Sequence, residues 1–190
     1  YLLVSTRDVK KNLDILEEFS QQINYYAFKG MMNLTITQKI KLILYKLNII
    51  KTYRHIKHMK EAYRYELKRM FAGARVDTLI QFSGYGNQRI NLFSCFDGNK
   101  IIYVHANMLE EINLRKNQRR DVLHYAYNAY DKVAVVTEDI IDSTYQISKR
   151  KDNIFVCHNV IDYETIQKKS NEKLEISEVT AVYPKQSDLY

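Results

Sequence analysis

Glycines and polar side chains that could bind a ligand follow an apolar run that ends at Phe82. Their loop permits tight turns of the backbone, and the helix expected after it offers N–H groups to an anion. Because the full GxGxxG pattern of dinucleotide-binding proteins is absent, an ordinary turn between a strand and a helix is the alternative. We predict a substrate-binding loop formed by Ser83, Gly84, Tyr85, Gly86 and Asn87.

A histidine at the end of the next apolar run is the best candidate for a catalytic group. The imidazole of His105 can exchange a proton near neutral pH, and Asn107 adds a neighbouring amide. A structural role is the alternative for a single histidine. Glu110 and Glu111 could act as general acid and base, but carboxylates in the first turn of a helix more often stabilise the helix dipole. We predict that His105 is catalytic and that Asn107 binds substrate.

Two further apolar runs end in polar residues that extend the predicted site. Thr137 follows the third run, and His158 and Asn159 follow the fourth. Thr137 suits the capping of a helix as well as binding. We predict that Thr137 and Asn159 bind substrate. The sequence contains no Ser/His/Asp order, no Gly-Lys-Ser/Thr phosphate loop and no convincing metal-ligand spacing, so we expect no metal and no cofactor.

The four runs are predicted to be strands of one sheet, which would bring their ends together. Each run precedes a stretch with helical spacing of its apolar residues. The strands are expected over 76–82, 100–105, 132–137 and 153–157, and the helices over 87–96, 108–130, 138–149 and 163–169. This alternation predicts an α/β fold with a doubly wound, parallel, Rossmann-like sheet that binds ligands beyond the carboxyl ends of its strands.

The first third of the chain is predicted to be helical. Apolar residues recur every three or four positions over 8–25, from Thr35 or Thr37 to Ile50, and over 53–71, with no alternation typical of a strand. We therefore divide the chain into a mostly helical basic part (residues 1–75), a Rossmann-like core (76–170) and a linker (171–190) toward a further, donor-binding domain.

The positive charge of the protein is concentrated in one segment. Residues 38–75 contain eleven Lys or Arg and two acidic residues, so their net charge is +9, whereas the whole chain carries +7. Large aliphatic residues accompany the lysines, a combination that suits an anionic membrane surface. We predict a membrane-surface role for Lys39, Lys41, Lys46 and Lys51. Nucleic acid is the less favoured partner, and a solvated helix is the structural alternative.

The composition excludes several classes of protein. With 46% hydrophobic residues, 12% aromatic residues, 5 Gly and 1 Pro in 190 residues, the chain is neither disordered as a whole nor collagen-like. No apolar stretch reaches the roughly 18 residues of a membrane span, and the start lacks the pattern of a signal peptide. Two cysteines without metal-ligand spacing favour a reducing compartment.

Four segments together resemble one family. Residues 76–86, 102–108, 130–137 and 158–162 are similar, in order and spacing, to the amino-terminal domain of GT-B glycosyltransferases of family 4. The resemblance extends from about Glu66 to Ser170. It is closest to the enzymes found with teichoic acid and capsule synthesis in Gram-positive bacteria.

The resemblance implies an enzyme that transfers a sugar from a nucleotide-sugar to a polysaccharide, teichoic acid or lipid-linked acceptor. This domain would bind the acceptor, with Gly84, Tyr85 and Gly86 lining its cleft, His105 near the transferred sugar, and Asn159 at the crossing to the donor domain. Such transfer is typically retaining and metal-independent, because helix N-termini and basic side chains stabilise the leaving diphosphate. The implied location is cytoplasmic, at the inner face of the membrane.

The chain also departs from the family pattern. It has neither the donor-binding domain nor the first strand with the Gly-rich loop that usually opens the fold, so we expect residues 1–190 alone to be inactive. Two alternatives remain open: a non-catalytic α/β module that binds an anionic membrane or nucleic acid, and a CDP-glycerol glycerophosphotransferase of the same fold.

Overall fold

The computed structural model describes residues 2–5, 25–28, 32–71, 73–114 and 118–171. The chain divides into two compact units, Tyr1–His158 and Asn159–Tyr190. Every strand of the described residues lies in the first unit, and the described part of the second unit holds helix α9 (Tyr163–Ser170). The Asp162 side chain caps α9 by accepting a hydrogen bond from the Thr165 amide.

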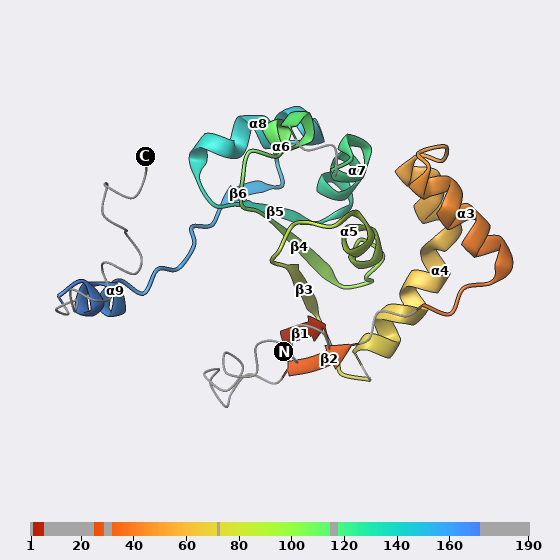
Figure 1. The fold of residues 1–190 in the computed structure, drawn as a ribbon, viewed down its shortest axis with the longest axis horizontal. Helices are drawn as coiled ribbons and strands as arrows, with labels where there is room; N and C mark the ends of the chain where they lie inside the picture. Colours follow the sequence, from red (N-terminus) through yellow and green to blue (C-terminus); the bar gives the residue numbers. More distant parts are fainter. Residues whose placement is uncertain (1, 6–24, 29–31, 72, 115–117, 172–190) are drawn as a thin grey trace, which may run out of the picture. The chain divides into compact units, whose positions relative to one another are not determined.

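The centre of the first unit is a four-stranded parallel sheet (Figure 1). Its strands are β3 (Thr78–Gln81), β4 (Asn99–Val104), β5 (Lys132–Val135) and β6 (Ile154–Val156), in the order of the chain. All four strands were predicted from the sequence. The α/β class, with a parallel sheet flanked by helices, is therefore confirmed.

The connections of this sheet are helical. They are α5 (Asn87–Phe93), α6 (Met108–Leu114), α7 (Arg120–Ala129), the 3-10 helix η1 (Glu138–Ile140) and α8 (Ile141–Ser148). The prediction of a single helix over 108–130 was wrong, because α6 and α7 are separate helices. Residues 115–121 are polar without exception, so they offer no apolar face that would hold one continuous helix against the sheet.

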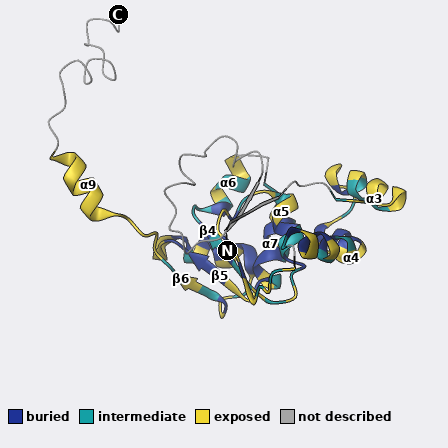
Figure 2. Cartoon of the chain, turned by 90° about the horizontal axis from the view of Figure 1, so that it is seen from below, coloured by how far each residue is buried: buried dark blue, intermediate teal, exposed yellow. Residues whose placement is uncertain are grey.

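The main hydrophobic core lies between one face of the sheet and these helices. Ile102, Val104, Val133 and Val135 pack there with Leu123 and other buried residues of α7 and α8. Right-handed crossovers between strands in chain order place their helices on the same face, which explains this arrangement. The other face carries exposed side chains, including Ile80, Phe82 and Phe155. Buried and exposed residues are coloured in Figure 2.

The basic segment forms two helices, α3 (Ile36–Lys46) and α4 (Thr52–Met70). Helix α3 begins at a capping box in which Thr35 and Gln38 satisfy each other's backbone amides. Helix α4 buries a stripe with helical spacing that includes Ile56, Met59, Tyr63 and Leu67, and it contacts α5 and α7. None of the helices in the described part of the chain is long and apolar enough to cross a bilayer.

Two short strands precede these helices, which corrects one expectation. Strand β1 (Leu2–Ser5) pairs in parallel with β2 (Tyr25–Phe28). We predicted helices and no strand before residue 76, because runs of four residues carry too little alternation to reveal a strand. Strands β1 and β2 form a sheet of their own, so they do not test the expectation that the first strand with its Gly-rich loop is missing. The helix predicted over 8–25 lies outside the described residues, except for Tyr25, which begins β2. The linker predicted over 171–190 also lies outside them, except for Asn171, which ends α9.

Candidate functional site

The carboxyl edge of the sheet brings the loops after β3 and β4 together. Parallel strands end at the same edge, and the register places Gln81 beside Ile102. Phe82 consequently lies next to Tyr103, with ring centroids 5.0 Å apart. The predicted substrate-binding loop of residues 83–87 therefore begins beside the predicted catalytic residue His105.

Two glycines of this loop have backbone conformations that other residues rarely adopt. Gly84 has φ +62° and Gly86 has φ +87°. A Cβ atom on Gly84 would lie 2.1 Å from the Tyr103 carbonyl oxygen, whereas a Cβ atom on Gly86 would meet no atom within 4 Å. Glycine is thus required at position 84 for two reasons: the backbone of β4 lies too close for a side chain, and φ is positive. At position 86 only the positive φ requires glycine.

His105 is held at the edge by one hydrogen bond and two aromatic contacts. Its Nε2 lies 2.5 Å from the Phe82 carbonyl oxygen. Because a carbonyl oxygen can only accept, Nε2 carries a proton, so in the neutral form of the ring Nδ1 is the acceptor. The ring stacks on Tyr103 at 5.6 Å and meets Phe82 edge-on at 4.8 Å. This arrangement fixes the imidazole and suits it to accept a hydrogen bond from a ligand hydroxyl.

A cavity of about 480 Å³ lies along the glycine loop. Four of the five predicted loop residues line it, together with Gln88 and the exposed Arg89 at the start of α5. The lining therefore combines two hydroxyl groups, amides and one cation. Such a set can hold a hydroxylated or anionic ligand.

The other predicted binding residues are less closely tied to this loop. Asn107 caps α6: its Oδ1 accepts from the Leu109 amide at 3.2 Å, and its Nδ2 donates to Glu110 at 2.8 Å. Thr137 is exposed at the start of η1 and makes no capping hydrogen bond with its side chain. Asn159 begins the second unit, so its place is described only within that unit. A binding role for these three residues stays a prediction.

Sequence reasoning missed two polar contacts near the ends of the strands, one made by Tyr103 on the exposed face of the sheet and one made by His158. The Tyr103 hydroxyl lies 2.8 Å from Cys157 Sγ, which raises the pKa of Tyr103. His158 Nδ1 lies 3.0 Å from the Val136 carbonyl oxygen, and its Nε2 lies 3.9 Å from Glu138. The strand period of two, which places residues 103 and 105 on one face, was the available signal. The alignment of Cys157 with them depends on register, which the sequence does not specify.

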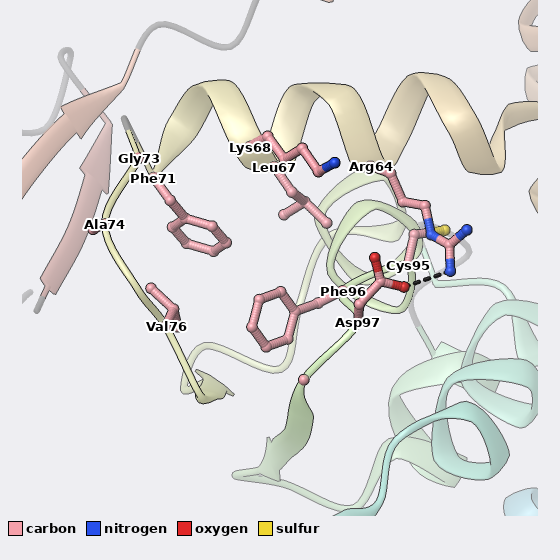
Figure 3. A pocket seen from close by; sticks show the side chains of 11 residues that line it. Arg64, Leu67, Lys68, Phe71, Gly73, Ala74, Val76, Cys95, Phe96 and Asp97 are labelled. Atoms are coloured by element: carbon pink, nitrogen blue, oxygen red, sulfur yellow. Dashed lines mark hydrogen bonds and ion pairs between the residues drawn. The ribbon is translucent and has the colours of Figure 1, made fainter.

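A second cavity, of about 410 Å³, lies near the amino ends of β3 and β4 (Figure 3). Leu67, Phe71, Val76 and Phe96 give it an apolar lining, and the Arg64–Asp97 ion pair lies at its side. It contains none of the predicted site residues. Among the described residues, no three His, Cys, Asp or Glu side chains are grouped so that they could hold a metal ion.

The four lysines predicted at a membrane surface lie on or just after α3. Lys39, Lys46 and Lys51 are exposed, and Lys41 is half-buried.

No family model matches this sequence, and no curated protein matches it.

Proposed function

We propose that this chain is the acceptor-binding part of a glycosyltransferase of the GT-B type, which transfers a sugar from a nucleotide-sugar to a cell-envelope polysaccharide, teichoic acid or lipid-linked acceptor. The observation that carries the proposal is the contact between the two predicted parts of the site. His105 hydrogen-bonds to Phe82 at 2.5 Å, directly before the glycine loop of residues 83–87.

The chemistry of this edge supports an acceptor rather than a donor role. Acceptor sugars and polyols present hydroxyl groups, which can donate to Nδ1 of His105. The cavity along the loop contains one cation, Arg89. A single exposed cation is a weak site for a nucleoside diphosphate, but it suits an acceptor that carries a phosphodiester. The donor would be bound by a second domain of the complete enzyme.

Two alternatives give different results in binding experiments. A CDP-glycerol glycerophosphotransferase would use the same acceptor edge and differ in its donor. A non-catalytic module for anionic membranes or nucleic acid would bind through α3 and α4 and would not need the glycine loop.

The test is an NMR titration of ¹⁵N-labelled residues 1–190 with a glycerol phosphate oligomer and with a neutral oligosaccharide. We expect at least one of them to shift the amides of residues 83–87 and 105, and His105→Ala to weaken that binding about tenfold or more. His58→Ala removes an exposed imidazole from α4 and is the matched control, which should bind normally. Shifts confined to α3 and α4, or no shifts, would contradict an acceptor site at this edge.

A further inference from the structure

Helix α3 carries an apolar stripe that no described residue covers. Ile36, Ile40, Ile43 and Leu47 follow one another at intervals of three or four residues along the helix and its C-cap. Their side chains are 77%, 52%, 56% and 64% exposed. Single exposed aliphatic residues are common, but four in one stripe form a continuous apolar surface.

Packing against the described residues does not explain the stripe, because α3 packs on them through its opposite side. At about 100° per residue, Tyr45 lies roughly 170° around the helix from the centre of the stripe. Tyr45 is buried, and its hydroxyl accepts a hydrogen bond from Asn91 at 2.7 Å. Its carbonyl oxygen accepts another from Arg119 at 2.7 Å. These bonds hold α3 in an orientation in which the stripe faces away from the core.

Positive charge borders the stripe. Lys39 and Lys46 are exposed and lie roughly 70–90° from its centre, both on the same side. The helix contains no acidic residue. Ile49 and Lys51, beyond the end of the helix, are also exposed and continue the same combination of side chains.

We propose that α3 docks this protein on an anionic lipid bilayer, with the stripe Ile36, Ile40, Ile43 and Leu47 inserted among the acyl chains and the lysines at the headgroups. Lysine suits this position, because its long stem can lie along apolar surface while its charge stays in water. Protein interfaces, by contrast, favour aromatic residues and Arg over Lys, and the stripe contains neither. The proposal concerns a surface distinct from the carboxyl edge of the sheet and holds whether or not that edge binds an acceptor.

The test is co-sedimentation of residues 1–190 with phosphatidylcholine vesicles that contain either no anionic lipid or 30% phosphatidylglycerol. We expect binding to the anionic vesicles that weakens as salt rises. The double change Ile40→Ser and Ile43→Ser should weaken binding at least tenfold, because two buried aliphatic side chains are lost. Ile161→Ser with Ile166→Ser, which alters two other exposed isoleucines, is the matched control and should not.

Charge variants test the second half of the proposal. Lys39→Gln with Lys46→Gln should weaken binding roughly 25-fold, about fivefold for each lysine near the surface. Lys132→Gln with Lys151→Gln removes the same charge from exposed positions elsewhere and should have little effect.

A fluorescent reporter measures insertion directly. The chain has no Trp, so Ile43→Trp provides a single probe, whose emission should shift to the blue with anionic vesicles. Equal binding to neutral vesicles, or no effect of the Ile40 and Ile43 changes, would overturn the proposal. A concentration-dependent dimer abolished by the same two changes would also overturn it and would assign the stripe to contact between copies.

Discussion

Protonation of a buried histidine should make the stability of this protein sensitive to mild acid. His55 lies on α4 and is fully buried. Its ring stacks on Tyr45 with centroids 3.9 Å apart, and its Nε2 lies 2.7 Å from the Tyr63 hydroxyl. Burial, followed by the positive charges of Arg119 and His58, lowers the pKa of His55 from 6.5 to about 4. The neutral imidazole is therefore the form that fits the folded protein.

The sign and size of the effect follow from this pKa. The unfolded chain binds the proton more tightly than the folded protein, so acid favours unfolding. The contribution is complete above pH 6.5 and is lost as the pH falls from 6.5 toward 4. Between pH 7 and pH 4.5 we expect the free energy of unfolding to fall by roughly 2.5 kcal/mol through His55.

A second titrating group, the half-buried Asp121, acts only at lower pH, so the range from pH 7 to pH 4.5 separates its effect from that of His55. Burial alone would raise the pKa of Asp121, but hydrogen bonds from Arg119 and Thr52 lower it below its ordinary value of 3.8. The stability that Asp121 contributes is thus lost only at a pH below that of the His55 range.

The assay is urea denaturation at pH 7 and pH 4.5, followed by circular dichroism. His55→Gln should reduce the loss of stability between the two pH values by roughly 2.5 kcal/mol. His58→Gln removes an exposed imidazole that is the last and smallest of the three causes, so most of the loss of stability should remain. An unchanged pH dependence in His55→Gln would show that a group other than His55 causes the loss of stability in acid.

Two further changes test the packing around the site and the attachment of the basic helices. Gly84→Ala should destabilise the protein by about 3 kcal/mol or more, whereas Gly73→Ala, at φ +81° with nothing within 4 Å, should cost only about 1 kcal/mol, as measured by urea denaturation. Similar values for both would show that close approach is not what requires Gly84. Asp121→Asn should cost about 2 kcal/mol by weakening hydrogen bonds between α7 and the start of α4 at 2.8 and 2.9 Å. The exposed control Asp152→Asn should melt like the wild type, and equal losses in both would contradict a special role for Asp121.

The sheet and its carboxyl edge were predictable because their signals are local. Apolar runs of five to seven residues, each followed by a stretch with helical spacing, predict parallel strands. The loop with Gly84 and Gly86 follows the first of these strands, and His105 follows the second. Once the strands are parallel, these loops meet at one edge, so their proximity follows from topology alone.

The remaining features depend on contacts between distant segments, which a single sequence does not specify. The pairing of Tyr103 with Cys157 depends on the register across three strands. Likewise, the amphipathic pattern of α3 predicted a helix but not which side would face outward. The bonds of Tyr45 decide that, and they leave the aliphatic stripe exposed.

The most direct test of the proposed transferase activity is the release of nucleoside diphosphate by the complete gene product, supplied with a panel of nucleotide-sugars and an acceptor extract from bacterial membranes. We expect release that depends on the acceptor and that falls 100-fold or more in His105→Ala, while His58→Ala keeps full activity. Equal activity in His105→Ala and the wild type would remove His105 from the site. Release from none of the nucleotide-sugars, by a folded protein that still binds anionic vesicles, would contradict the transferase and leave the membrane surface of α3 as its function.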